Sequence, residues 1–327
     1  MRVVPPADIE VLRSPATMEP LSYDSASKCL VTASGVRYPV RTHADHSYID
    51  FLSDRAGTLP GIAQHQRAIY DSNATRNYPK KRQDGASFMH KFLRSRFRGR
   101  VKSKEELIYR AMRHCQLSSS SRVLEIGCND GRYLNLCTQM HGCIGVGIDL
   151  AEHAIQQAIE VKPPELRTQF HVAEASRLPF ATKAFDCIIS FDVFEHLGHS
   201  GFEQTMKECS RVLTSKGKLI VYIVSQKDEF TLHQTIQRIS GGRCGVDNQD
   251  GHVFESFIHP DFFRQVAQDS GFTTKDLIAY HGFWTLFAEE FLFNAPPKLA
   301  YKLFEALDYA LTRYEYGNGF LAICETA

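Results

Sequence analysis

A strand-like run that ends in an acid and a glycine turn occupies residues 123–131 and reads Val-Leu-Glu-Ile-Gly-Cys-Asn-Asp-Gly. The residues in this run that could contact a ligand are Glu125, Gly127, Asn129 and Gly131. Glycines let backbone N–H groups approach a ligand, and a following helix offers the positive end of its dipole. The spacing departs from the G-x-G-x-x-G pattern that holds a pyrophosphate, because Gly127 and Gly131 are four residues apart. The run therefore predicts a nucleotide cradle for a ligand with a carboxylate and an amine.

A second acid follows at the end of the next strand-like run, Val-Gly-Ile-Asp-Leu at residues 146–150. From that position the Asp149 carboxylate can accept both ribose hydroxyls of an adenosine. The alternative is that Asp149 only caps the helix expected after it. Because the two motifs are in register, we favour nucleotide binding by Asp149 and Leu150.

Acid–base candidates follow a later strand, in the run Phe-Asp-Val-Phe-Glu-His-Leu-Gly-His at residues 191–199. In a parallel sheet this run emerges beside the ligand, so His196 or His199 could take a proton from a hydroxyl near neutral pH, with Glu195 alongside. The alternative is that His196 only satisfies buried backbone groups. Weaker candidates are His252, His259 and His281.

These residues need a scaffold, and residues 121–224 alternate β-branched runs with helical patterns, which predicts a βαβ series and a parallel sheet. Strands are expected at 122–127, 143–149, 168–173, 185–191 and 218–224, with helices at 133–140, from about 152, and around Phe202, Met206, Cys209 and Leu213. Beyond them we expect helices at 230–239, 260–270 and 297–311, and strands at 274–280 and 320–324.

The flanks predict three parts. Residues 1–55 form a small β appendage, with strand-like pieces at 28–32, 36–40 and 48–52. Residues 56–120 form a helical lid or lead-in, whose helix begins at Ser103. Residues 121–327 form the nucleotide-binding domain, with cap insertions at about 226–259 and 284–316.

The composition of the chain argues against several classes of protein. The chain has 327 residues, 43% of them hydrophobic, and 38 basic against 37 acidic residues, so no global field favours nucleic acid or membrane. Its nine cysteines are scattered and never form a C-x-x-C pair, which fits neither a disulfide framework nor a zinc site. No apolar run reaches the length of a membrane span. We therefore expect a cytoplasmic protein without a bound metal.

With these motifs in hand, residues 121–224 resemble the class I S-adenosylmethionine (SAM) dependent methyltransferases, especially those that act on small molecules. Further matches are Glu-Ala-Ser-Arg-Leu-Pro-Phe at 174–180, Phe-Asp-Cys-Ile at 185–188 and Arg-Val-Leu-Thr-Ser-Lys-Gly at 211–217. The resemblance implies an α/β, Rossmann-like sheet, mostly parallel with an antiparallel last strand, carrying a helical cap and the β appendage. It implies SAM as cofactor, with Glu174 accepting from the adenine amino group and the Ala175 backbone meeting the ring.

Two smaller likenesses concern the flanking motifs. Residues 29–52 resemble a zinc-ribbon-like appendage found ahead of some methyltransferases, but only Cys29 remains, so the likeness implies a packing role without zinc. The run around Glu195 also resembles fatty-acid cyclopropane synthases, in which that glutamate helps to hold a bicarbonate base.

Aromatic faces attract a sulfonium through cation–π interactions, and the candidates are Tyr70, Tyr78 and Phe191. For the two tyrosines, exposed loop positions are an equal alternative. The acceptor is expected to be a small molecule of secondary-metabolite, lipid or quinone biosynthesis, free, phosphorylated or carrier-bound. O-methylation is favoured because histidines cluster where a hydroxyl needs a base.

Three alternatives stay open. Residues 80–102 hold nine basic residues and three phenylalanines against one acid, which suits an RNA methyltransferase, although the neutral total charge disfavours nucleic acid. The same cradle also serves enzymes that cyclise SAM or proteins that sense it. An NAD-dependent oxidoreductase is disfavoured by the glycine spacing.

Overall fold

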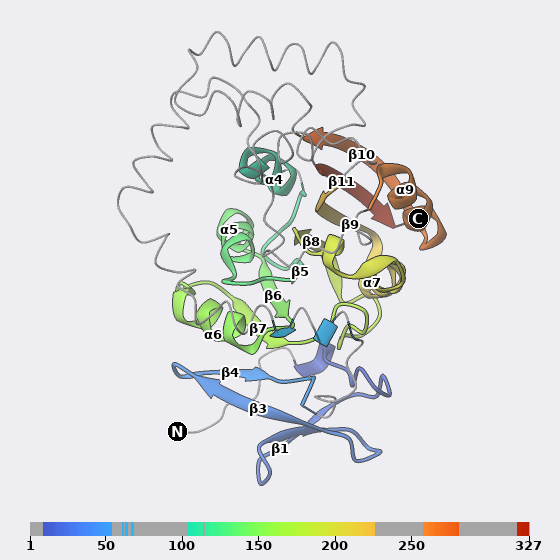
Figure 1. The fold of residues 1–327 in the computed structure, drawn as a ribbon. Helices are drawn as coiled ribbons and strands as arrows, with labels where there is room; N and C mark the ends of the chain where they lie inside the picture. The colour runs from blue at the N-terminus through green and yellow to red at the C-terminus, as the bar shows by residue number, and fades with distance from the viewer. Residues whose placement is uncertain are drawn as a thin grey trace, which may run out of the picture.

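The computed structural model describes residues 9–53, 61, 63–64, 67–68, 104–113, 115–225, 258–280 and 319–326. These ranges form a central seven-stranded sheet with helices on both faces and a four-stranded sheet from the N-terminal part of the chain (Figure 1). None of the helices in them is long and apolar enough to cross a membrane.

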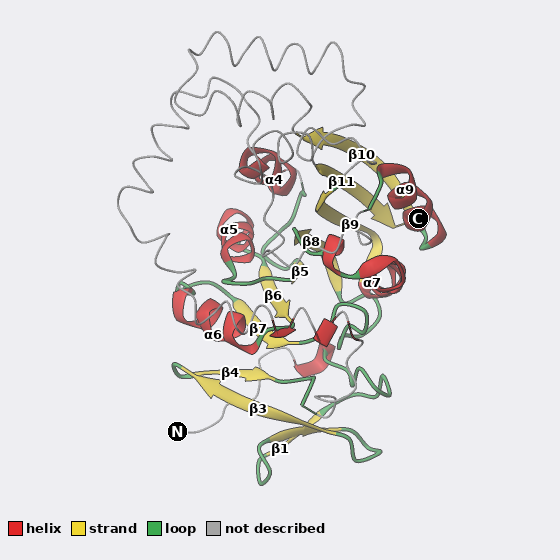
Figure 2. Cartoon of the chain, viewed as in Figure 1, coloured by secondary structure: helices red, strands yellow, loops and turns green. Residues whose placement is uncertain are grey.

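The central sheet has the strand order β10-β11-β9-β8-β5-β6-β7 (Figure 2). Its strands are β5 (Arg122–Ile126), β6 (Ile144–Asp149), β7 (Thr168–Val172), β8 (Phe185–Phe191), β9 (Leu213–Val224), β10 (Phe272–Tyr280) and β11 (Gly319–Thr326). The pairs among β5 to β9 are parallel, whereas β11 lies antiparallel between β9 and β10. The predicted fold class, a mostly parallel sheet with an antiparallel last strand, is confirmed.

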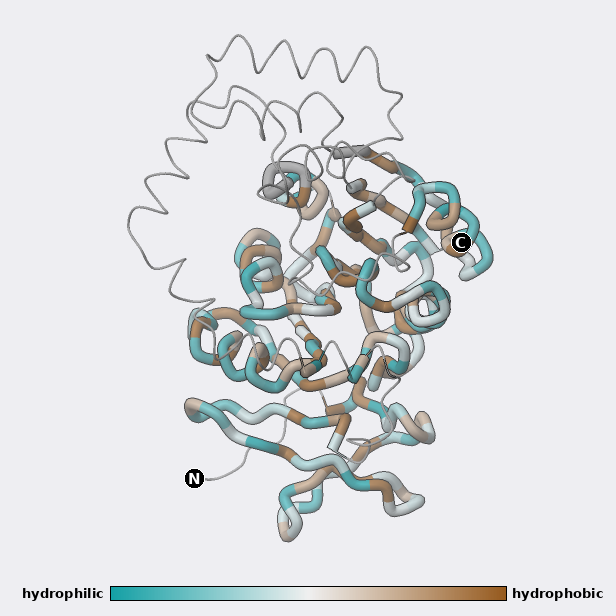
Figure 3. Tube along the Cα trace, viewed as in Figure 1, coloured by the Kyte–Doolittle hydropathy of each residue, from teal (hydrophilic) through white to brown (hydrophobic). Residues whose placement is uncertain are grey.

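Helices cover both faces of this sheet. They are α4 (Lys104–Arg113), α5 (Arg132–His141), α6 (Glu152–Val161), α7 (Gly198–Val212) and α9 (Pro260–Asp269), with the short η1 (Ile9–Val11) and η2 (Phe194–His196). Buried residues of α4, α5 and α6 share one core cluster, and those of α7 and α9 share the other with the N-terminal sheet. The helices alternate hydrophobic and hydrophilic residues along their length, as expected of elements with one buried face (Figure 3).

The N-terminal sheet is an antiparallel meander of β1 (Ser22–Asp24), β2 (Cys29–Val31), β3 (Arg37–His43) and β4 (His46–Ile49). Isolated bridges join Asp50 to Val172 and Leu12 to Phe180, so the meander continues into the edge of the central sheet. Tyr38 is fully buried there, and its hydroxyl lies 2.8 Å from Ser14 Oγ. The predicted appendage therefore packs on the main domain and shares its core.

Some boundaries differ from the sequence expectation. β1 was not predicted, and residues 50–52 leave the meander toward β7 instead of ending a strand. α7 ends at Val212 because the backbone of Leu213 is extended, and β9 begins there, five residues before the predicted start. An irregularity explains the difference: Phe185 pairs with Leu213, but Cys187 pairs with Lys218. The helices expected at 230–239 and 297–311 lie outside the described residues.

Cys29 is half-buried, and its thiol contacts the Ser27 carbonyl oxygen at 3.4 Å. Within the described ranges, no three His, Cys, Asp or Glu side chains gather in a way that could hold a metal ion.

Candidate functional site

The acids selected from the sequence lie at one edge of the central sheet. Glu125, Asp149 and Glu174 belong to the carboxyl-terminal ends of β5, β6 and β7 or to the residues just after them, and these strands are neighbours and parallel. The carboxyl edge of such a sheet is where α/β folds bind ligands. The three acids therefore lie at neighbouring strand ends, as expected from the sequence.

The glycine turn between β5 and α5 adopts left-handed backbone conformations at Gly127, Asn129 and Gly131, with φ of 70°, 45° and 69°. A Cβ on Gly127 would lie 2.3 Å from Val193 Cγ2, and one on Gly131 would lie 2.6 Å from Phe170 Cζ. Both glycines are thus required by neighbouring protein side chains as well as by their backbone conformation. The sequence alone predicts only that these glycines let a ligand approach the backbone.

Glu125 is only 2% exposed, and its Oε2 accepts a hydrogen bond of 2.9 Å from the Leu134 backbone N–H in the first turn of α5. This bond satisfies one of the N–H groups that a helix start leaves without an intrahelical partner. Burial raises the pKa of the Glu125 carboxyl well above its usual range. In this structure Glu125 shapes the turn by fixing the helix that follows it.

Asp149 links two loops of the site. Its Oδ2 accepts from the Asn129 N–H at 3.0 Å, and its Oδ1 accepts from the Ala151 N–H at 2.9 Å, just before α6. The capping alternative is therefore partly realised, since one oxygen serves the approach to the helix. A carboxylate has about four lone-pair positions, so accepting two backbone N–H bonds is compatible with accepting ribose hydroxyls as well. The neighbouring Leu150 is half-buried and packs against the core.

The segment after β7 is fixed by hydrogen bonds to its neighbours. Ala173 N–H donates to the Asp149 carbonyl at 3.0 Å, and Ser176 Oγ donates to Glu174 Oε1 at 2.6 Å. Glu174 is half-buried and Ala175 is 9% exposed.

The following Leu-Pro-Phe is anchored to α7. The Leu178 N–H donates to Glu208 Oε2, and the Arg211 guanidinium donates to the carbonyls of Leu178 and Phe180. Glu208, which bonds Arg211 at 2.7 Å, was missed by the sequence reasoning because its role depends on a contact about 30 residues away in the chain.

An aromatic pair adds to this edge. Phe191, at the end of β8, is 6% exposed and meets Tyr133 of α5 edge to face, with ring centroids 4.9 Å apart. The Arg132 guanidinium lies over the Tyr133 ring at 4.3 Å. Tyr133 and Arg132 were not singled out from the sequence, although their place directly after Gly131 was a usable signal. Tyr70 and Tyr78 lie outside the described residues.

The candidate acid–base groups separate into two environments. Glu195 and His196 lie in η2, directly after β8, and are 1% and 8% exposed. His199 is exposed in the first turn of α7, where its ring packs against Phe262 of α9 at 4.7 Å. His259 caps α9 by accepting from the Asp261 N–H, and His252 and His281 are outside the described residues.

Residues 124–221, which contain this edge of the sheet, match the family described as methyltransferase domain. These residues are similar to methyltransferase domains, and the described sheet has the class I methyltransferase fold. The magnesium protoporphyrin IX methyltransferase ChlM of Synechocystis, solved with bound SAH, has the same fold, with a TM-score of 0.52, 15% identity and coverage of 80% of this chain and 99% of that one.

Two curated relatives match part of this chain. "Probable tRNA methyltransferase 9B" of Mus musculus is 35% identical over 106 residues, which cover 32% of this chain and 22% of that protein. "2-methyl-6-phytyl-1,4-hydroquinone methyltransferase" of Synechocystis is 27% identical over 113 residues, 35% of each chain. The match thus spans well under two thirds of either relative's length.

SAM is the cofactor of this class of methyltransferase domain, and the described residues fit it. Its adenosine requires acceptors for ribose hydroxyls and for an exocyclic amine, and half-buried carboxylates stand on adjacent strand ends at Asp149 and Glu174. Its positively charged sulfonium suits a neighbouring aromatic face such as that of Phe191 or Tyr133.

Proposed function

We propose that this protein is a SAM-dependent methyltransferase that acts on a small-molecule acceptor. The observation that carries the proposal is the placement of Asp149 and Glu174 at the ends of the neighbouring parallel strands β6 and β7. Both lie beside the glycine turn after β5, whose backbone is left-handed at three residues. The quinone methyltransferase relative supports a small acceptor of this kind.

When bound, SAM supplies a methyl group on a positively charged sulfonium. In the proposed site Asp149 would hold the ribose, Glu174 would accept from the adenine amino group, and the Ala175 backbone would meet the ring. Phe191 and Tyr133 place aromatic faces near the positive charge. The main tasks of the protein are then to align donor and acceptor and to exclude water.

The test is to mix the protein with SAM and small hydroxylated aromatic and quinol acceptors, and to analyse the products by mass spectrometry. We expect S-adenosylhomocysteine (SAH) together with an acceptor that is one methyl group heavier. Methylthioadenosine without a methylated acceptor would instead indicate cyclisation of SAM. Failure of SAM and SAH to bind in calorimetry would overturn the proposal.

For an O-methylation we propose His196 as the base that accepts the proton of the acceptor hydroxyl. His196 ends η2, five residues after β8, and is largely withdrawn from solvent, whereas His199 is exposed and packs on α9. We expect His196→Asn to lower kcat by about 10²- to 10⁴-fold. The SAH dissociation constant should stay within about twofold of wild type. A similar loss of kcat in His199→Asn, with His196→Asn fully active, would assign the base to His199 instead.

A tRNA acceptor is the second candidate, favoured by the 35% identity to the mouse relative. It predicts methyl transfer to bulk tRNA and a retention on tRNA that weakens steeply with salt, because phosphate contacts release counterions. Transfer of labelled methyl groups to tRNA but to no small acceptor would replace the first proposal with this one.

A further inference from the structure

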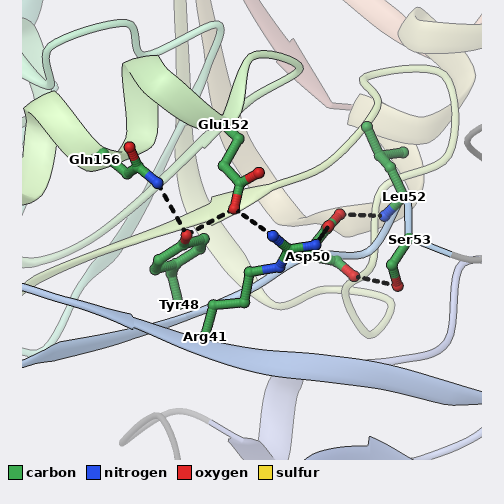
Figure 4. Close-up of polar contacts among 7 residues, drawn as sticks. All are labelled: Arg41, Tyr48, Asp50, Leu52, Ser53, Glu152 and Gln156. Atoms are coloured by element: carbon green, nitrogen blue, oxygen red, sulfur yellow. Dashed lines mark hydrogen bonds and ion pairs between the residues drawn. The ribbon is translucent and has the colours of Figure 1, made fainter.

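The N-terminal meander contacts the cofactor edge through a small polar network (Figure 4). Arg41 of β3 donates through one guanidinium nitrogen to Asp50 Oδ2 and through the other to Glu152 Oε1, each at 2.9 Å. The Tyr48 hydroxyl of β4 donates to the same Glu152 oxygen at 2.7 Å and accepts from Gln156 Nε2 at 3.3 Å. One arginine therefore joins two carboxylates that belong to different parts of the fold.

Each of these carboxylates lies close to an adenosine-binding position. Glu152 is the first residue of α6, three residues after Asp149. Asp50 bridges Val172 at the end of β7, and the next residue, Phe51, donates its N–H to the Val172 carbonyl at 3.0 Å, two residues before Glu174. The network thus fixes the two strand ends that carry Asp149 and Glu174.

The network is anchored by its buried members, whereas the side chains of Arg41 and Glu152 are 43% and 23% exposed. Tyr48 is 2% exposed, and the Asp50 side chain is 3% exposed. Burial raises the pKa of Tyr48 to about 12, so its hydroxyl remains a donor to Glu152 at physiological pH. A planar guanidinium with several donors in a fixed fork suits the bridging of two acceptors, which a lysine cannot reproduce in the same geometry.

We propose that Arg41 and Tyr48 are positioning residues that hold the β6–α6 and β7 strand ends in the spacing that adenosine requires, so that the meander acts as a clamp on the cofactor site. The inference rests on the proposed function, because the clamp matters only if the site binds SAM. It gives the appendage a role beyond packing.

The chain offers a matched control on the same surface. His43 of β3 contacts Glu160 of α6 at 2.7 Å, so it also joins the meander to this helix. Glu160 lies eight residues beyond Glu152, about 12 Å further along the helix and away from Asp149. Breaking this contact removes a connection between the meander and α6 without touching the clamp.

The test compares Tyr48→Phe, Arg41→Gln and His43→Gln by calorimetric titration with SAH and with 5′-methylthioadenosine, which lacks the amino-acid tail. We expect affinity to fall about threefold in Tyr48→Phe and about tenfold in Arg41→Gln, equally for both ligands, because the clamp acts on the adenosine half. His43→Gln should bind both ligands within about twofold of wild type. Thermal unfolding of the ligand-free variants, measured in parallel, shows that each is folded at the titration temperature.

The clamp is overturned if wild type binds SAH and both Tyr48→Phe and Arg41→Gln bind it as tightly, whatever their melting temperatures. An equal loss in His43→Gln also overturns it, because the effect would then be general undocking of the meander. If wild type itself binds neither ligand, the proposed function fails first and the clamp falls with it. These outcomes separate the two proposals.

Discussion

At the scale of single residues, position at a strand end is what pointed to Asp149 as a proposed cofactor residue. Asp149 ends a β-branched run, a pattern that can be recognised without knowing the fold, whereas Glu174 was implied by the resemblance to methyltransferases. Glu208 and Arg41 could not be found in this way. Their importance depends on partners that the fold, and not the local sequence, brings near.

Glu125 yields a residue-scale prediction about charge. Because burial raises its pKa and its oxygen only accepts from the Leu134 N–H, a neutral amide should replace it well. We expect Glu125→Gln to change the free energy of unfolding by less than about 1 kcal/mol, and Glu125→Ala to lower it by about 2 to 4 kcal/mol through a cavity and an unsatisfied N–H. Urea denaturation measures both. Equal losses in the two variants would mean that the native structure depends on the charged carboxylate.

At the scale of elements, the alternating pattern was sufficient to place β5 to β8, α5 and α6 within a few residues. It failed where pairing decides the boundary, as at β9, whose early start is set by its irregular pairing with β8. Lys216 has φ of 65° there, and a Cβ on the next residue, Gly217, would lie 2.8 Å from the Thr214 carbonyl oxygen. Such a distortion within a strand leaves little trace in hydrophobic periodicity.

The turn between β5 and α5 yields an element-scale prediction. Gly127→Ala should lower the free energy of unfolding by about 2 to 4 kcal/mol, because the new Cβ meets Val193 and an L-residue is strained at positive φ. In the Val193→Ala background the same change should cost only about 1 to 2 kcal/mol, the backbone part. Gly35→Ala is the control: its φ is 93° and nothing lies within 4 Å of the added Cβ, so it should cost only this backbone part too. The free energies of unfolding are measured with denaturant. If the loss in the Gly127→Ala, Val193→Ala double variant equals the sum of the two single losses, the contact with Val193 is contradicted.

At the scale of the whole molecule, the sequence predicted a docked appendage but not how it docks. The docking uses bridges to β7, the clamp and His171, a buried residue of β7 whose Nδ1 accepts from the Ile49 N–H at 3.3 Å. None of these contacts has a local signature in the sequence. The proposed cap insertions at 226–259 and 284–316 stay predictions. The helical lid at 56–120 also stays a prediction, except for the helix α4.

His171 yields a prediction about pH. Burial lowers its pKa from 6.5 to about 4, so the native state favours the neutral ring and the unfolded chain binds the proton more readily. The stability associated with the neutral His171 ring is fully present above pH 6.5. As pH falls toward 4, the free energy of unfolding decreases by about 3 kcal/mol in all. We expect His171→Asn, which keeps an acceptor near Nδ1, to be less stable at pH 7.5 but to lose less stability between pH 6.5 and 4. Parallel curves for the two proteins in chemical denaturation across this range would exclude His171 as the source.

The position of β11 has a consequence for how the protein forms on the ribosome. In the sheet order β10 reaches β9 only through β11, although β10 is synthesised first. An emerging chain can therefore pair β5 to β9 while β10 has no partner strand, and the sheet is complete only after residues 319–326 leave the exit tunnel. During that interval β9 has an open edge, which residues 319–326 cover in the folded protein.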